Sequence, residues 1–148
     1  MEQTQSNALT NEDKMIGMFS HFSIFLGGLI IPLIFWLIYK EKSKFIRFHS
    51  LQAMFFHIAF IVIIFLWVFI IVFAIVGLGL ASAGSHAVTG HGAPGLFVLL
   101  MVVVYAMLFL IIFGIYGLAI YMGIKSYHGE YVKYPLIGNM VYKHIFGG

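Results

Sequence analysis

The chain contains two long stretches without a single charged side chain. Met15–Tyr39 has no Asp, Glu, Lys or Arg over 25 residues, and Phe48–Ile124 has none over 77 residues. A helix that crosses the hydrocarbon core of a bilayer needs about 20 apolar residues. The first stretch is therefore long enough for one membrane-spanning helix, and the second is too long to be a single one.

The second stretch is interrupted by residues that favour turns. Ala81–Gly95 reads ASAGSHAVTGHGAPG, which is rich in Gly, Ser and Ala and contains Pro94. The flanking segments are each long enough to cross a bilayer. They are continuously apolar rather than alternating, which favours helices over a membrane β-barrel. We therefore expect an all-α membrane protein with three transmembrane helices, at about 15–39, 51–80 and 96–124.

Composition supports the membrane assignment. Hydrophobic residues make up 62% of the chain and charged residues 9%, against about 25% charged residues in soluble domains. So few polar groups could not cover the surface of a soluble monomer. We expect a polar tail over residues 1–14 and one membrane domain over residues 15–148. Cysteine is absent, which excludes disulfides and thiolate metal sites.

Basic residues flank the predicted helices unevenly. The loop over residues 40–47 has four basic residues against Glu41, and the segment from Lys125 onward has three against Glu130, whereas the N-terminal tail is net acidic. The positive-inside rule then predicts a multi-pass cell-membrane protein with this short basic loop and the C-terminus in the cytoplasm and the N-terminus outside. The basic residues that define this orientation are Lys40, Lys42, Lys44, Arg47, Lys125, Lys133 and Lys143.

The same cations indicate which partners the chain would meet. Anionic lipid headgroups on the cytoplasmic side attract each of them by roughly 1 kcal/mol, so lipid explains the positive charge better than nucleic acid does. The apolar and basic residues of the tail are compatible with an interfacial C-terminal helix. Tyrosines near the end of the third helix, Tyr134 among them, match an interfacial aromatic belt. A protein partner or a second copy of the chain also remains open.

The first predicted helix contains residues that distort helices. Pro32 lacks an amide hydrogen and crowds the carbonyl of Gly28, and Gly27 makes the distortion easier. We expect a bend here. One interpretation is an ordinary kinked membrane helix, whose freed carbonyl finds a neighbour. The other is a broken helix that exposes the carbonyl to an ion or substrate, as in many transporters.

A few polar side chains lie inside the predicted spans. His49 and His57 share a face of the second helix, Gln52 is adjacent, and His21 lies in the first. Burial of polar groups in hydrocarbon is costly, so we expect this face to point into the bundle. A proton relay, a haem or metal ligand, and partner binding are alternatives to hydrogen bonding between helices, which we favour for His57. A haem between His21 and His57 fits poorly, because antiparallel helices would place them about 15 Å apart in depth, and we expect no cofactor or metal.

Enzymatic chemistry has few residues to use. All five acidic residues lie outside the predicted spans, whereas intramembrane hydrolysis would need embedded carboxylates or a His-Glu metal motif. A GxSxG motif is also absent. We therefore expect a protein that is not an enzyme.

Three segments carry a family resemblance. They are FIRFHSLQA (Phe45–Ala53), LGGLIIPLIFW (Leu26–Trp36) with His21 before it, and GEYVKYPLIGN (Gly129–Asn139). In this order they resemble a family of small prokaryotic membrane proteins of unknown function, related to the twenty-kilodalton Tic subunit of chloroplast protein import. The resemblance implies a helical, non-enzymatic membrane protein. The resemblance does not imply channel activity, because the chloroplast subunit has four spans and this chain is expected to have three.

Two functions from different classes follow. The first, which we favour, is a scaffold or accessory component of a membrane complex, whose basic loop and tail dock lipid or a protein. The second is a small oligomeric transporter or channel subunit built around the bent first helix and the face of His57 and Gln52.

Overall fold

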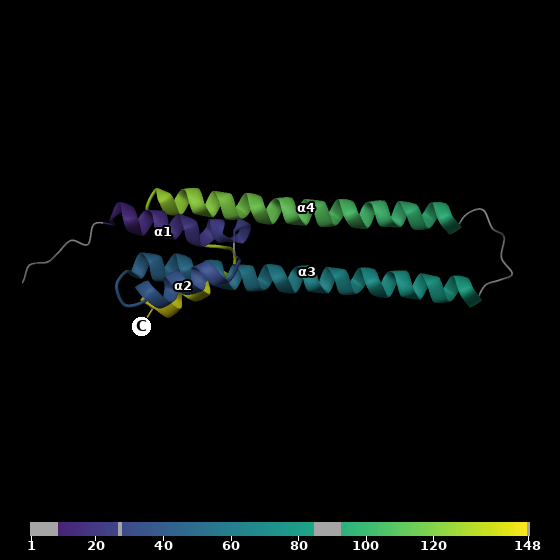
Figure 1. Ribbon diagram of the computed structural model, residues 1–148, viewed down its shortest axis with the longest axis horizontal. Helices are drawn as coiled ribbons and strands as arrows, with labels where there is room; N and C mark the ends of the chain where they lie inside the picture. Colours follow the sequence, from purple (N-terminus) through teal and green to yellow (C-terminus); the bar gives the residue numbers. More distant parts are fainter. Residues whose placement is uncertain (1–8, 27, 85–92, 148) are drawn as a thin grey trace, which may run out of the picture. The chain divides into compact units, whose positions relative to one another are not determined.

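The computed structural model describes residues 9–26, 28–84 and 93–147. Every regular element in these residues is helical (Figure 1), so the expected all-α class is confirmed. The elements are α1 (Asn11–Phe22), the 3-10 turn η1 (Ser23–Phe25), α2 (Ile30–Tyr39), α3 (Lys44–Gly84), α4 (Ala93–Tyr127) and α5 (Ile137–Phe146). The chain forms two compact units. We call residues 1–59 with 116–148 the terminal unit, and residues 60–115 the middle unit.

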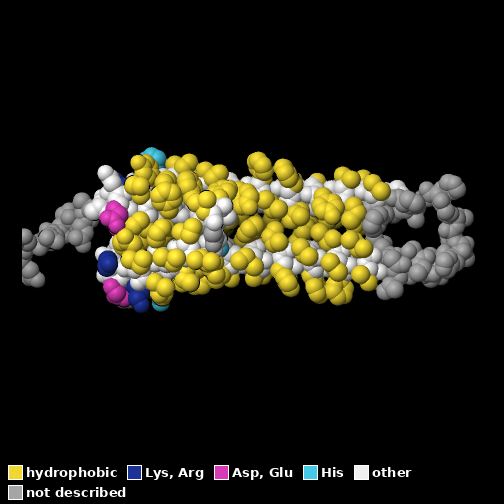
Figure 2. Space-filling view, in the orientation of Figure 1, with side chains coloured by type: hydrophobic (Ala, Val, Ile, Leu, Met, Phe, Trp, Pro, Cys, Tyr) yellow, Lys and Arg dark blue, Asp and Glu magenta, His cyan; other side chains and the backbone are white. Residues whose placement is uncertain are grey.

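The middle unit consists of the second part of α3 and the first part of α4. Large apolar side chains such as Phe65, Phe109 and Phe113 are mostly exposed there, and Figure 2 shows hydrophobic side chains along the described part of both helices. Two stretches, Lys44–Gly77 and Val98–Tyr127, are long and apolar enough to cross a membrane. They overlap the second and third expected spans. Exposed apolar surface of this extent is suited to lipid rather than water.

The first expected span, residues 15–39, is not one helix. It is divided among α1, η1 and α2. At 1.5 Å per residue, α1 is about 18 Å long and α2 about 15 Å, and neither reaches across a hydrocarbon core of about 30 Å. The expectation of three continuous transmembrane helices is therefore not met by this segment.

The break has a local cause in the residues that precede α2. Gly28 has a φ of 54°, a left-handed conformation that glycine adopts without the steric penalty of other residues. Pro32 lies in the first turn of α2, where a missing amide hydrogen costs no helical hydrogen bond. We expected a bend within one helix here, and the structure instead has two separate helices. Gly27 lies outside the described residues.

Two hydrogen bonds show that the chain reverses between α1 and α2. The Tyr39 hydroxyl donates to Glu12 Oε1 over 2.8 Å, and Ser43 Oγ donates to Asp13 Oδ1 over 2.6 Å. These contacts join the start of α1 to the end of α2, so the two helices form a hairpin. The expectation that the first helix separates the start of the chain from the basic loop is wrong, because residues 12 and 39 lie side by side.

Asp13 links the hairpin to the cap of α1. Its carboxylate accepts from the amide and hydroxyl of Thr10, and the Thr10 hydroxyl in turn accepts from the Asp13 amide. This reciprocal arrangement is a capping box. Partial burial raises the pKa of Asp13, but the hydrogen bonds from Ser43 and Thr10 outweigh it and hold the pKa below its usual value.

Small residues allow α1 to approach both long helices closely. A methyl group at Gly17 would overlap Ser126 Oγ of α4 and the Phe45 ring of α3. One at Gly123 of α4 would overlap the Phe22 ring. Such close approach is the packing mode expected of helices in lipid. By contrast, a methyl group at Gly77 or Gly114 would meet no described atom within 4 Å.

The chain after α4 turns sharply twice before α5. Gly129 (φ 83°) follows the end of α4, and its amide donates to Ser126 O, as in a left-handed helix cap. Leu136 has φ 64° and ψ −61°, and Ile137 N donates to Pro135 O, which together describe a strained γ-turn. The helix α5 then packs on α3 in a small core of Phe48, Leu51 and Val141. The expected C-terminal helix is thus present.

The hairpin predicts which residues reagents reach from one side of a membrane. Because the chain has no cysteine, single cysteines can be introduced without background. We expect Asn11→Cys and Glu41→Cys in sealed vesicles to react with an impermeant maleimide from the same side. Reaction from opposite sides would restore a continuous first span and contradict the hairpin.

A second prediction follows from the lowered pKa of Asp13. A carboxyl whose pKa is depressed on folding stabilises the fold at neutral pH and loses this contribution as the pH falls through its folded pKa. Thermal unfolding in detergent should therefore show a loss of stability below about pH 4 that is smaller in Asp13→Asn. Equal acid sensitivity in the two proteins would show that Asp13 does not tie the hairpin.

Candidate functional site

Three aromatic side chains from three parts of the terminal unit meet in its interior. His21 comes from the last turn of α1, His49 from the second turn of α3, and Tyr134 from the segment between α4 and α5. All three are at most 1% exposed. Tyr134 Oη lies 3.1 Å from His21 Nδ1, and His21 Nε2 lies 3.0 Å from His49 Nδ1. The chain of contacts ends at the Glu130 carbonyl oxygen, 3.1 Å from His49 Nε2.

The contact between His49 and the Glu130 carbonyl determines which atom is the donor in each of these hydrogen bonds. A carbonyl oxygen only accepts, so His49 Nε2 carries a hydrogen. A neutral His49 then accepts at Nδ1, which makes His21 Nε2 the donor and leaves His21 Nδ1 to accept from the Tyr134 hydroxyl. Neutral rings are favoured because burial disfavours the charged form. Each group therefore donates a hydrogen bond to the next, from Tyr134 to His21, from His21 to His49, and from His49 to the Glu130 carbonyl.

Tyr134 is held as a donor by its surroundings. Burial raises the pKa of its hydroxyl, so the group keeps its proton at physiological pH. Its ring stacks on Phe56 of α3, with centroids 4.0 Å apart and planes 7° apart. The phenol is thus fixed at both its face and its hydroxyl.

Gln52 fastens the same segment to α3 one turn further along. Its Nε2 donates to Val132 O over 3.0 Å, and its Oε1 accepts from the Tyr134 amide over 3.0 Å. The side-chain amide thereby satisfies a carbonyl and an N–H of a chain segment that has no helical partners. We call His21, His49, Gln52 and Tyr134 the buried polar network.

Two serines extend the polar contact between α1 and α3. Ser20 Oγ and Ser50 Oγ lie 3.1 Å apart and are both buried. Ser20 Oγ also donates to Ile16 O over 2.8 Å, so Ser50 is the donor in the contact between the hydroxyls. The two helices are therefore linked by serine as well as by histidine.

His57 is buried but stands apart from the buried polar network. Its side chain is 2% exposed, and neither ring nitrogen has hydrogen-bond geometry to a partner among the described residues. The backbone of Gly28 faces the ring. The expected alignment of His49, Gln52 and His57 is thus divided: the first two belong to the buried polar network, whereas His57 faces the Gly28 backbone.

Sequence reasoning missed two of the polar contacts in the terminal unit. Tyr134 was expected in an interfacial belt but is buried, and the serines of α1 and α3 were not singled out. The signal for Tyr134 was its place in GEYVKYPLIGN (Gly129–Asn139), a segment with polar and aromatic residues outside any apolar run. Its partners could not be found from spacing, because His21 and Tyr134 are separated by 113 positions.

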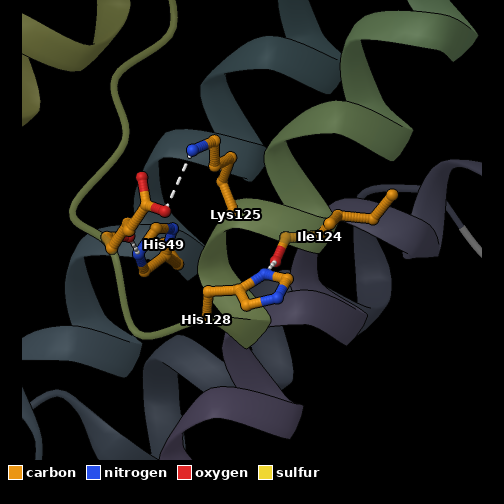
Figure 3. A network of polar contacts seen from close by, with 5 residues as sticks. His49, Ile124, Lys125 and His128 are labelled. Atoms are coloured by element: carbon orange, nitrogen blue, oxygen red, sulfur yellow. Dashed lines mark hydrogen bonds and ion pairs between the residues drawn. The ribbon is translucent and has the colours of Figure 1, made fainter.

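The predicted basic residues divide into two groups. Lys40, Lys42, Lys44 and Arg47 border one cavity of about 630 Å³ at the start of α3, and Figure 2 shows Lys, Arg and acidic side chains gathered at that end of the terminal unit. The others lie elsewhere in the unit. Lys125 forms an ion pair with Glu130 over 3.0 Å beside His49 and His128 (Figure 3), Lys133 lies over the Tyr142 ring, and Lys143 is in the last turn of α5.

Metal-ligating residues are not clustered in the described ranges. Among residues 9–26, 28–84 and 93–147, no group of three or more His, Asp or Glu side chains is placed to hold a metal ion. His21 and His49 are close, but each nitrogen between them is used in the chain of hydrogen bonds.

A family model matches nearly all of the folded chain. The match covers residues 12–141 and is to the MamF/MmsF family, described as a magnetosome magnetite crystal formation protein family. The chain belongs to this family. Searches of curated proteins and of solved structures found no match.

Membership in the MamF/MmsF family corrects the resemblance drawn from sequence. The segments likened to the Tic-related family, from His21 to Asn139, all lie within the 12–141 match. A relation to the chloroplast import subunit is therefore not supported. Short apolar motifs with scattered His, Gly and Pro are common to many membrane helices, so they do not distinguish one family from another.

The buried polar network predicts a specific cost for removing one hydroxyl. Tyr134→Phe keeps the stacking on Phe56 but leaves His21 Nδ1 without a donor. An unsatisfied buried acceptor costs about 1–3 kcal/mol, which thermal or denaturant unfolding in detergent would measure. The matched control is Tyr142→Phe, which removes a hydroxyl outside the network. Equal stability of the two variants would contradict the assigned donor role.

Proposed function

We propose that this chain is a non-enzymatic accessory protein of the membrane system in which its family takes part in magnetite crystal formation. In this proposal α3 and α4 anchor the chain in the bilayer, and the terminal unit provides a folded surface at one membrane face for a partner of the same system. The observation that carries the proposal is the inward use of the buried polar groups. Their hydrogen bonds hold chain segments together instead of facing a substrate.

The geometry of the buried polar network supports a structural role rather than a proton relay. The chain from Tyr134 through His21 and His49 ends on the Glu130 carbonyl, which cannot take up a proton under ordinary conditions. The side-chain amide of Gln52 also has both of its groups in hydrogen bonds to the backbone, one as donor and one as acceptor. A transporter that used Gln52 and His57 would need Gln52 available to a passing solute, which argues against that alternative.

The sidedness of the anchor is part of the same proposal. The basic cavity residues at the start of α3 and Lys125 at the end of α4 belong to one unit. The positive-inside rule assigns such a face to the cytoplasm. Because of the hairpin, the start of α1 would lie on this face too.

In-membrane photocrosslinking with mass spectrometry tests the accessory role. A photoreactive residue at Leu136 or Met140, which are exposed on the terminal unit, should repeatedly capture one protein of the native membrane. The control position is Phe109, an exposed residue of the middle unit, which should capture lipid.

The transporter alternative predicts a different outcome. It requires solute flux in proteoliposomes that His57→Leu abolishes without lowering insertion. Such flux, together with no captured protein from Leu136 or Met140, would overturn the accessory role.

A further inference from the structure

A cavity of about 630 Å³ opens between the start of α1 and the start of α3. Its border includes Lys40, Lys42, Lys44, Arg47, Thr10 and Tyr131. The cavity is separate from the buried polar network, whose residues do not line it. A volume of this size is in the range that holds a small organic ligand, and is larger than a single phosphate ion needs.

The net charge of the residues that line the cavity is positive. Four basic residues line it, against Asp13 and Glu41. The carboxylate of Asp13 is already engaged by Thr10 and Ser43. In the part of the chain that the structure describes, the one ion pair joins Lys125 to Glu130, neither of which lines the cavity. The four basic residues outnumber the two carboxylates at the cavity, so an anion would meet a net positive charge.

Aromatic rings hold the lysines in place without removing their charge. Lys40 Nζ lies 5.3 Å from the centroid of the Trp36 ring, and Lys42 Nζ lies 5.6 Å from that of Tyr39. A ring attracts a cation through its quadrupole and leaves the ammonium hydrogens free for an acceptor. The lysines are thus partly ordered before a ligand arrives, which lowers the entropy lost on binding.

Arg47 provides the most specific sign of a missing acceptor. Its Nε is buried and has no hydrogen-bond partner in the described structure. A buried donor of this kind costs free energy until an acceptor binds it. Guanidinium groups bind phosphate with two parallel hydrogen bonds, more strongly than neutral donors do. Arg47 also borders the cavity, so its guanidinium and the surrounding lysines suit a tetrahedral oxyanion.

We propose that this cavity binds a phosphate group, carried either by an anionic phospholipid headgroup or by a soluble phosphate compound. Arg47 binds the phosphate oxygens through its guanidinium, and Lys40, Lys42 and Lys44 supply the surrounding positive charge. The site requires only the folded terminal unit, so it stands independently of the accessory role and of any protein partner.

The test uses the full chain in nanodiscs and two probes. In one arm, native mass spectrometry measures retention of phosphatidylglycerol relative to phosphatidylcholine. In the other, calorimetry measures binding of inorganic phosphate to the chain in phosphatidylcholine nanodiscs. Arg47→Gln should weaken binding of whichever probe binds, phosphatidylglycerol or inorganic phosphate, about tenfold, which corresponds to about 1.4 kcal/mol. Lys143→Gln, with the same charge change outside the cavity, should leave it within about twofold.

The pattern of results distinguishes the sources and can overturn the site. Binding in the lipid arm alone identifies a headgroup site, and binding in the phosphate arm identifies a site open to soluble phosphates. Lys42→Gln, at an exposed position, provides a second variant should Arg47→Gln fail to fold, and it should weaken binding severalfold. Absence of binding in both arms would show that the cavity is not a phosphate site. Equal weakening by the cavity variants and Lys143→Gln would show diffuse electrostatic attraction instead of a site.

Discussion

The terminal unit depends on hydrogen bonds that α3 makes with the non-helical segment between α4 and α5. Backbone groups in such a segment have no helical partners, and burial removes them from water. The Gln52 amide supplies a donor to Val132 and an acceptor to Tyr134, and His49 supplies a donor to Glu130. With the segment fixed in this way, Tyr134 reaches His21, and the following turn directs α5 onto the core of Phe48, Leu51 and Val141.

The hairpin of α1 and α2 also depends on hydrogen bonds between polar side chains. α1 carries Ser20 and His21 on the side that meets α3, so it packs as a polar-faced helix rather than as a lipid-facing span. Reversal at Gly28 then brings the end of α2 back to the capping box of α1. The result gathers the basic loop, the start of α1 and the end of α4 into one unit, which is what creates the positively charged cavity.

Histidines and tyrosines in a membrane protein invite a chemical interpretation, and the geometry favours a structural one. Each nitrogen of His21 and His49 is used once, and the chain of donors ends on a backbone carbonyl. The chain belongs to the MamF/MmsF family, which is described as a magnetosome magnetite crystal formation protein family. The hydrogen bonds of these side chains hold segments of the terminal unit together.

The sequence by itself determined the helical class, the two long apolar helices, an irregularity near Gly28 and Pro32 that was expected as a bend, and the concentration of basic charge beside the helices. These properties follow from local composition, because apolar length, glycine and proline act within a few residues. Charge-free length did not distinguish a spanning helix from a hairpin, since Met15–Tyr39 is equally apolar in both. Only the tertiary structure decided that His21 meets His49 and Tyr134, that Gln52 binds the segment after α4, and that His57 lies outside this network. These pairings join residues tens of positions apart, and they depend on how α1, α3 and α4 pack, which no local pattern encodes.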